Sequence, residues 1–375
     1  IPSTDEVLSI LGAYSLSRVF PIDPRNEERT REAGLHLWYI VKVPEDTDIV
    51  EACERLSCLG EVSQAKCNRY IYRTPSRPGT FISCTQADAM AASFTTKVAP
   101  MYNDPYLDCQ WNYINKGNAP FEKPWAPVIA GSDVGCGEAW KLCTGDPSII
   151  VAVFDEGVMY DHPDLAANMW VNESEEMGSS IDADGNGYKG DRYGYNFTKD
   201  MGTIRYGGVY DTGHGTHVGG TIAAVNNNGI GVCGIAGGNG QPDSGVKIMS
   251  CQIFDDGYVC TVANEARAMK YAADNGAVIM QCSWGYNSSL SNILTGYTPG
   301  PATEDEWYST YPLEKEALDY FIHNAGSPNG VIDGGLAIFA SGNEYAAMSA
   351  FPAAYSGCIS VSAISADYTP ASYSN

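Results

Sequence analysis

The chain has 375 residues, of which 44% are hydrophobic and 18% charged, an ordinary composition for a globular protein of about two domains. Its formal net charge of −23 argues against nucleic acid and anionic membrane surfaces as partners, because both require a basic face. The longest apolar runs are short, such as segment 148–154, whereas a membrane-spanning helix needs about 20 apolar residues. No membrane span is therefore predicted.

Residues 1–75 have the pattern of a small α+β domain. Segment 35–43 is strand-like, and segment 62–73 alternates between apolar and polar residues as a second strand would. Between them, segment 48–60 has the apolar spacing of a helix, with Gly60 where a C-terminal cap is expected. A domain of this size is too small to hold a deep active site of its own.

The apolar segment 7–20 adds a further strand or helix to this first domain. Residues 76–103 lack sustained periodicity and are predicted to be an exposed linker, part of which lies across the domain that follows. We therefore expect a second and larger domain over residues 104–375.

From about residue 131, apolar segments of strand length alternate with helical patterns. The predicted strands are 148–154, 245–254, 277–284, 335–341 and 358–364, and the predicted helices lie at about 214–226, 261–275 and 313–325. This alternation predicts an α/β fold with a doubly wound, mostly parallel sheet that helices cover on both faces. In such sheets, ligands and catalytic groups gather at the carboxyl ends of the strands.

Polar residues stand where that edge of the sheet is expected. Asp155 directly follows the first predicted strand, and Asn343 follows the fourth. The third predicted strand closes with Ser283, Trp284 and Gly285. Because the carboxyl ends of parallel strands meet at one edge, we expect these residues to lie near one another.

The segment DTGHGTHVGGTIAA (211–224) places His214 and His217 at the start of a helical pattern. The residues at the spacing of its buried face are Val218, Ile222 and Val225. The glycine-rich run lets the backbone approach another part of the chain closely, which favours a functional histidine over a core histidine. A metal site made by the two histidines is less favoured, because the glutamate of the zinc-protease helix motif is missing.

The twelve cysteines include no two matched Cys-x-x-Cys pairs, so a zinc cage is not predicted. Cys251 and Cys282 lie within strand-like apolar runs and are interpreted as small buried hydrophobic residues. The spacing of Cys136 and Cys143 allows a disulfide, although sequence alone does not fix connectivity.

Four segments carry a family resemblance. VAVFDEGVMYDHPDL (151–165), DTGHGTHVGGTIAA (211–224), VIMQCSWG (278–285) and AIFASGNE (337–344) resemble, in order, the motif blocks of the subtilisin-like serine proteases, or subtilases. The resemblance covers roughly residues 104–375 and implies a subtilisin-like fold. It also makes residues 1–75 similar to the inhibitory propeptide of that family.

The resemblance implies a role for three residues in peptide-bond hydrolysis. Asp155 matches the triad aspartate, His214 the triad histidine and Asn343 the asparagine that stabilises the oxyanion. His217 matches a histidine without a catalytic role. An imidazole suits general acid–base work because it titrates near neutral pH.

The resemblance also implies how a peptide is held. Ser283, Trp284 and Gly285 would form a backbone edge against which the substrate pairs as an added strand, and Gly257 resembles the second such edge. Phe351–Pro352 matches a position where a cis peptide bond is expected.

Two features depart from the family pattern. Glu156 follows the aspartate where the family usually has Ser or Thr, and the nucleophile block Gly-Thr-Ser-x-Ala does not occur in these 375 residues. We expect the catalytic domain to be incomplete after Asn375, with the serine on a second chain that remains bound. The alternatives are a truncation and a non-catalytic relative.

An acidic loop predicts a cation site. Asp182, Asp184 and Asn186 alternate like the opening of an EF-hand loop, Tyr188 is placed to offer its carbonyl, and Asp191 to close the shell. The twelfth-position glutamate is absent, so the loop is not an EF-hand. Calcium at loops is common in the resembling family, which favours a structural calcium.

Together these features predict a secreted or envelope-associated serine endopeptidase that acts on peptide or protein substrates without an organic cofactor and is held by its own propeptide. The alternative from another class is a catalytically silent, subtilase-like peptide-binding protein. A third hypothesis is a metal hydrolase that uses His214 and His217.

Overall fold

The computed structural model describes residues 3–71, 89, 92, 101–119, 127–209, 211–256, 258–291, 298–326 and 332–375. Most of the predicted linker 76–103 lies outside the described residues, and so does Gly257.

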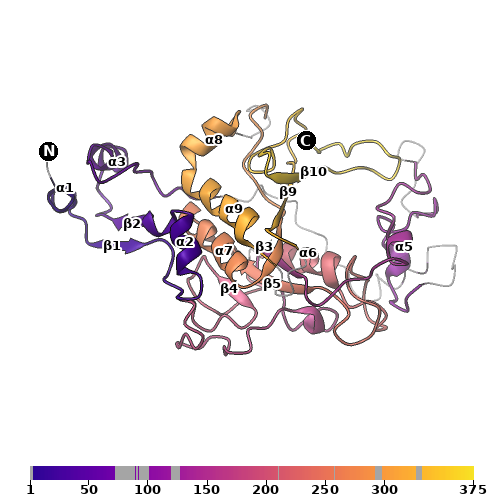
Figure 1. Ribbon diagram of the computed structural model, residues 1–375. Coiled ribbons are helices and arrows are strands. Elements are labelled where there is room, and N and C mark those ends of the chain that lie inside the picture. The colour runs from indigo at the N-terminus through magenta and orange to yellow at the C-terminus, as the bar shows by residue number, and fades with distance from the viewer. Residues whose placement is uncertain are drawn as a thin grey trace.

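The centre of the molecule is a six-stranded, parallel sheet (Figure 1). Its strand order is β10-β9-β8-β3-β5-β4, and every neighbouring pair is parallel. The strands are β3 (Ile150–Asp155), β4 (Gly194–Asn196), β5 (Lys247–Gln252), β8 (Ala277–Cys282), β9 (Leu336–Ala340) and β10 (Cys358–Val361). The predicted doubly wound sheet is confirmed. The three-residue edge strand β4 was not predicted, because it is too short to show a period.

Three longer helices cover this sheet: α6 (His214–Ala223), α7 (Val262–Asp274) and α9 (Pro312–Asn324). Each overlaps a predicted helix. Thr261 caps α7 by accepting from the backbone N–H of Asn264, and Pro312 starts α9, where its missing N–H costs nothing.

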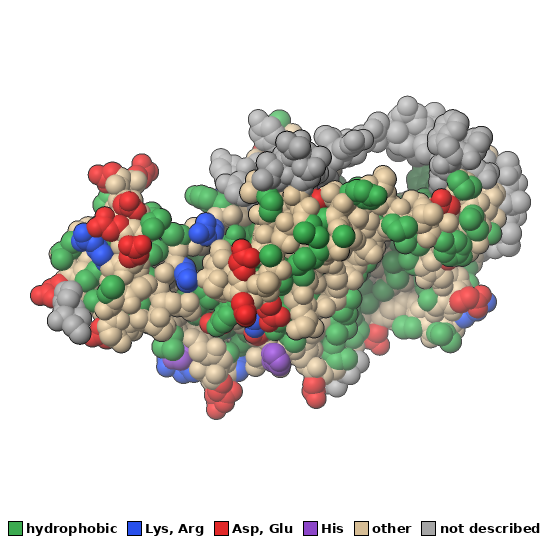
Figure 2. Space-filling view, turned by 90° about the horizontal axis from the view of Figure 1, so that it is seen from above, with side chains coloured by type: hydrophobic (Ala, Val, Ile, Leu, Met, Phe, Trp, Pro, Cys, Tyr) green, Lys and Arg blue, Asp and Glu red, His purple; other side chains and the backbone are tan. Residues whose placement is uncertain are grey.

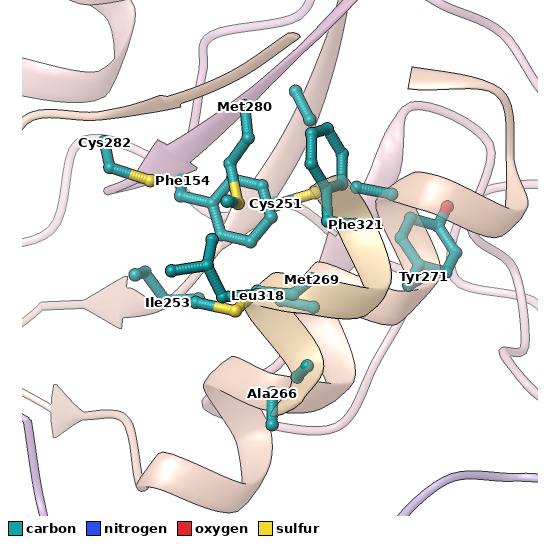
Figure 3. Close-up of a cluster of buried hydrophobic side chains, with 14 of the residues drawn as sticks. Phe154, Cys251, Ile253, Ala266, Met269, Tyr271, Met280, Cys282, Leu318 and Phe321 are labelled. Carbon is teal, nitrogen blue, oxygen red and sulfur yellow. The ribbon is translucent and has the colours of Figure 1, made fainter. Parts of the chain in front are cut away.

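The side chains of β3 alternate between two cores, one on each face of the sheet. Ala152 and Phe154 belong to the larger core, and Val151 and Val153 belong to the smaller one beside α6. In the larger core, Phe154 lies among side chains of α7 and α9 such as Leu318 (Figure 3). Because β3 is buried on both faces, its sequence is continuously apolar from Ile150 to Phe154, before the terminal Asp155.

The buried face of α6 differs from the expected one. It consists of Gly215, Gly219 and Ala223, whereas Val218 and Ile222 are only partly buried. A Cβ at Gly215 would lie 2.2 Å from the carbonyl oxygen of Glu156, so the helix needs glycine there to approach the strand end. The small residues therefore set the closeness of α6 to the sheet.

The N-terminal part is a small α+β unit, as predicted. Its elements are α1 (Thr4–Ile10), β1 (Ser15–Arg18), α2 (Glu27–Glu32), η1 (Leu35–Leu37), β2 (Tyr39–Lys42) and α3 (Ile49–Ser57). Strands β1 and β2 pair in antiparallel fashion. The apolar segment 7–20 contributes both a helix and a strand.

Three details of that unit were predicted wrongly. Segment 35–43 is a strand only from Tyr39, because Leu35–Leu37 form a 3-10 turn after Gly34, whose φ is +75°. Residues 62–71 form no strand beyond a single bridge of Tyr70. Helix α3 ends earlier than expected, with Cys58 rather than Gly60 at its C-cap.

The N-terminal unit packs beside α7 and α9 (Figure 1). Arg29 donates from Nη2 to Asp274 Oδ1 on α7 (2.8 Å), and Trp38 donates from Nε1 to Glu316 Oε2 on α9 (2.6 Å). Four of its residues join the larger core: Val19, Phe20, Leu35 and Ile71. On the face shown in Figure 2, its acidic and basic side chains are intermixed.

The remaining elements are short. They are η2 (Leu107–Cys109), α5 (Cys136–Ala139), η3 (Ala166–Asn168), β6 (Phe254–Asp255), β7 (Tyr258–Val259) and α8 (Glu304–Thr310). The cysteines of the described residues are all free thiols, so the disulfide between Cys136 and Cys143 is not formed. Cys136 is the buried first residue of α5, whereas Cys143 is exposed beyond the end of that helix. Cys251 and Cys282 are buried, as predicted.

Candidate active site

Asp155 ends β3 and turns its carboxylate toward α6. The residue is 1% exposed, and its Oδ1 and Oδ2 each lie 2.8 Å from Nδ1 of His214. The backbone N–H of Glu156 also donates to Oδ1 (2.7 Å). A carboxylate has only acceptors, so Nδ1 is the donor and Nε2 remains the basic nitrogen of the ring.

His214 is the first residue of α6, and its side chain is 28% exposed. The helix begins after Gly213, which has no side chain to cap it. Glu156 performs that task instead, because its Oε2 accepts from the backbone N–H groups of Thr212 (3.1 Å) and His214 (3.2 Å). The residue that departs from the family pattern therefore fixes the turn that carries the histidine.

The predicted polar residues of three segments line one cleft. His214 lies on one side, Ser283, Trp284 and Gly285 follow β8, and Asn343 follows β9. The cleft is completed by residues that the sequence did not single out, namely Tyr286, Ala340, Gly342, Glu344 and Ala350. The expected meeting of these segments at one edge of the sheet is therefore observed.

The wall of this cleft is held by its backbone. The N–H of Tyr286 donates to the carbonyl of Phe351 (2.8 Å), and the Phe351–Pro352 peptide bond is cis, as expected. The indole of Trp284 is buried against Phe339, with ring centroids 5.5 Å apart. Only the backbone edge of Trp284 is thus placed to meet a ligand.

The loop of Asn343 presents an exposed side chain. Gly342 has φ +122°, a conformation that favours glycine, and turns the chain after β9. Asn375 Oδ1 accepts from the N–H groups of Glu344 (3.0 Å) and Ala346 (2.9 Å), which ties this loop from below. An exposed amide beside His214 offers a donor to a ligand in the cleft.

His217 lies outside the cleft lining. It is exposed one turn along α6, and its carbonyl accepts from Thr221 Oγ1 (3.0 Å). Within the described ranges, the two histidines belong to no group of metal-binding side chains. Nothing there favours the metal-hydrolase hypothesis.

The acidic loop contains a group of carboxylates that can hold a metal ion. Oxygens of Glu175, Asp182 and Asp184 lie within 4.8 Å of one another, the separation that one shared cation requires. Backbone N–H groups orient two of them: Gly187 donates to Asp182 Oδ2 (2.8 Å), and Gly190 donates to Glu175 Oε2 (2.9 Å). Sequence reasoning missed Glu175, because it precedes the loop and only the fold brings it there.

The other predicted ligands have partners within the protein. Asn186 donates to Asp191 Oδ2 (3.0 Å), and Tyr271 on α7 donates its hydroxyl to the same oxygen (2.8 Å). Burial raises the pKa of Asp191 to about 6. The ring of Tyr188 is buried against Tyr271, with centroids 4.8 Å apart. These side chains anchor the loop to α7.

A pair of acidic residues lies in the larger core. Glu265 on α7 and Glu314 on α9 are both fully buried. Glu314 Oε2 accepts from the Tyr286 hydroxyl (2.8 Å) and from Trp307 Nε1 (3.1 Å). Burial raises the pKa of Glu314 to about 7, and burial together with the neighbouring Glu314 carboxyl raises the pKa of Glu265 well above its usual value. Sequence analysis gave no sign of this pair.

Comparison with known proteins identifies the family. The model of the Subtilase family matches residues 146–375, which include the strands, α6 and the cleft described above. The chain belongs to the subtilase family. The predicted membership of this family and the predicted fold class are thereby confirmed.

Several subtilases are similar over part of their length. The halolysin-like extracellular serine protease Nep of Natrialba magadii is 28% identical over 256 residues, which cover 68% of this chain and 37% of that protein. Subtilisin-like protease 1 of Plasmodium vivax is 34% identical over 206 residues, covering 55% of this chain and 28% of that protein. The chain thus spans about a third of the length of these relatives.

Among solved structures, the serine protease of Aeromonas sobria in complex with its chaperone ORF2 is 22% identical, with a TM-score of 0.49. The match covers 75% of this subtilase and 42% of that chain. In the described part of this subtilase, no helix has both the length and the apolar character needed to cross a membrane.

Proposed function

We propose that this subtilase supplies the aspartate, the histidine and the oxyanion donor of a serine endopeptidase. One observation carries the proposal: His214, held at 2.8 Å by the buried Asp155, lines the same cleft as Asn343. A ring that is fixed through Nδ1 and keeps Nε2 basic is what general-base catalysis by histidine requires.

The proposed reaction is acyl transfer through a serine ester. His214 Nε2 takes the proton of the serine hydroxyl as the oxygen attacks the peptide carbonyl, and returns it to the leaving amine. Asp155 holds the tautomer and stabilises the imidazolium. Asn343 donates to the oxyanion of the tetrahedral intermediate. Water then hydrolyses the ester by the same proton transfers.

The nucleophile is proposed to come from a segment beyond Asn375. The 375 residues hold no Gly-Thr-Ser-x-Ala block, whereas the acid, the base and the amide are all in place. Whether that segment is covalently continuous or a bound second chain is decided by the experiment below.

The substrate is proposed to be a peptide or protein segment in extended conformation. Ser283, Trp284 and Gly285 line the cleft and offer the backbone edge along which it would pair. Gly257 is assigned to the opposite edge from its resemblance alone. The name of the Natrialba magadii relative describes an extracellular protease, which supports a secreted or envelope location.

Residues 1–75 are proposed to act as an inhibitory propeptide, residues 76–103 as a linker and residues 104–375 as the catalytic domain. The contacts of the N-terminal unit support this. Its last described residues run antiparallel to the start of α7: Ile71 N–H donates to the Cys260 carbonyl, and Val262 N–H donates to the Arg69 carbonyl, both at 2.9 Å. This pairing joins the end of the described N-terminal unit to the segment that starts α7.

The acidic loop is proposed to hold a structural calcium ion through Glu175, Asp182 and Asp184. The donor set fits, because calcium prefers carboxylate oxygens and tolerates irregular geometry. A bound cation would offset the mutual repulsion of the three carboxylates. Chelation is expected to lower the midpoint of thermal unfolding, and Asp182→Asn to abolish the response to added calcium. A wild-type midpoint that chelation leaves unchanged, or an Asp182→Asn variant that responds to calcium as the wild type does, would refute the calcium site.

A fluorophosphonate probe tests the proteolytic function on the full natural protein after removal of the N-terminal unit. We expect labelling of a serine outside these 375 residues, and intact mass before and after denaturation shows whether it lies on a separate chain. His214→Ala should abolish labelling without unfolding the protein. Absence of labelling in the folded wild type would support a peptide-binding protein instead.

A further inference from the structure

Two thiols of the N-terminal unit face each other. Cys53 lies on α3 and Cys67 on the segment that follows it, 14 residues later, with their Sγ atoms 3.8 Å apart. Both side chains are half-buried. A disulfide needs its sulfur atoms at about 2 Å, so the two Sγ atoms must approach by about 2 Å to bond.

The segment between these thiols is held mainly by turns and by the buried side chain of Leu59. Residues 58–71, here called the strap, contain no helix or strand. Near its middle, Ala65 N–H donates to Ser57 Oγ (3.2 Å). Its far end is fixed to the catalytic domain, where Asn68 Oδ1 accepts from Ala263 N–H (3.1 Å) and Ile71 pairs with Cys260.

We propose that Cys53 and Cys67 form a disulfide that fastens the strap to α3. The oxidant is a small external disulfide such as glutathione disulfide. A thiolate of the pair attacks one sulfur of glutathione disulfide, forms a mixed disulfide and releases one glutathione thiolate. The second thiolate of the pair then displaces the other glutathione. Two protein thiols are oxidised, and one external disulfide is reduced to two thiols.

Burial limits the reactivity of Cys53. Burial, together with the neighbouring Cys67, raises the pKa of the Cys53 thiol to about 11. Cys53 is therefore rarely a thiolate at neutral pH. Once one thiol of the pair has formed the mixed disulfide, the other can resolve it from 3.8 Å away.

The disulfide has a mechanical consequence. It closes the loop between Cys53 and Cys67. The last residues of the strap are then fixed twice, to α3 through Cys67 and to the catalytic domain through the hydrogen bond of Ile71 with Cys260. Reduction leaves the strap attached to its own unit mainly through turns. The contact of residues 67–71 with the start of α7 thus depends on thiol oxidation. This dependence does not require the protein to be an active protease.

Cys58 provides a matched control, because it is an exposed thiol at the end of α3 and five residues from Cys53. The tryptic sites Arg55, Lys66 and Arg69 place the three cysteines on separate peptides, 43–55, 56–66 and 67–69. A disulfide can therefore be assigned directly by mass.

The protein is equilibrated in a glutathione redox buffer, its free thiols are alkylated, and it is digested without reduction. We expect peptide 43–55 joined to peptide 67–69, with peptide 56–66 alkylated. Alkylation of both Cys53 and Cys67 in the oxidising buffer overturns the proposal, as does a linkage that uses Cys58.

Hydrogen exchange of the Ile71 amide tests the consequence for the strap. Exchange should be several-fold slower in the oxidised protein than in the reduced one. Cys53→Ser should remove this difference, and Cys58→Ser should retain it. Equal exchange in the two redox states of a protein that has formed the bond would overturn the anchoring role.

Discussion

Two regions of this subtilase contain buried carboxyl groups, and these groups differ in their hydrogen-bond partners. Asp155 at the end of β3 receives Nδ1–H of His214 and the N–H of Glu156. Glu265 between α7 and α9 is equally buried, but both of its oxygens lack a donor among the described N–H and O–H groups apart from a proton shared with Glu314.

The difference teaches what burial alone does to a carboxyl group. Asp155 is buried beside an imidazole ring, and in the proposed reaction its carboxylate stabilises the imidazolium. The core pair is buried with a second carboxyl, so both prefer to stay protonated. The first region orients the histidine of the proposed catalytic site, whereas the second ties α7 to α9 beside Tyr286 of the cleft.

The largest effect on kcat is expected from a change at Asp155. Asp155→Asn keeps the shape but presents an amide donor to Nδ1, which forces the proton onto Nε2 and removes the base. We expect kcat of the full-length protein to fall by about 10⁴-fold. Peptidase kinetics measure it. Asp161→Asn, an exposed neighbour that accepts from the Tyr206 hydroxyl, should change kcat little.

Removal of the oxyanion donor should have the next largest effect. Asn343→Ala deletes an exposed amide that would bind the tetrahedral intermediate more tightly than the substrate. We expect kcat to fall by about 100- to 1,000-fold, the range known for this donor in subtilisin itself, with KM little changed. Tyr345→Phe, two residues away and exposed, serves as the control. A change in KM alone would contradict the assignment.

The core pair predicts a pH dependence of stability. The folded protein keeps protons on Glu265 and Glu314 that the unfolded chain releases above its ordinary pKa of 4.5. The free energy of unfolding should therefore decrease as pH rises from about 4.5 through 7. Glu265→Gln keeps the shape without the charge and gives Glu314 a donor.

At pH 8 this variant should be more stable than the wild type by on the order of 2–4 kcal/mol. Denaturant unfolding between pH 5 and 8 measures the slope. Glu138→Gln, at a side chain that is 83% exposed, is the matched control. Parallel pH profiles for Glu265→Gln and the wild type would refute the shared-proton interpretation.

The smallest effect is expected at the cap of α6. Glu156→Ala removes the acceptor of the Thr212 and His214 N–H groups and should lower the free energy of unfolding by about 1 kcal/mol. Glu156→Gln keeps an acceptor and should lose less. Both are measured by denaturant unfolding. A wild-type value for Glu156→Ala would show that the turn holds without the cap.

Much of the fold was predictable because its strands and helices leave local patterns. The five predicted strands of the sheet and the three helices were found close to their places, as was the edge where Asp155, His214 and Asn343 meet. Predictions failed where the local pattern misleads. Segment 62–71 alternates like a strand, but among the described residues it forms a single bridge, between Tyr70 and Thr261, and no described strand pairs with it.

The sequence by itself determined the parallel sheet and the order of its polar strand ends. Buried parallel strands require continuous apolar runs, so polar residues can stand only where those runs end. Only the tertiary structure decided which distant groups meet. Glu175 joins Asp182, Glu265 meets Glu314, and Cys53 faces Cys67. No periodicity records these contacts, because each depends on how separate segments pack rather than on the spacing within any one of them.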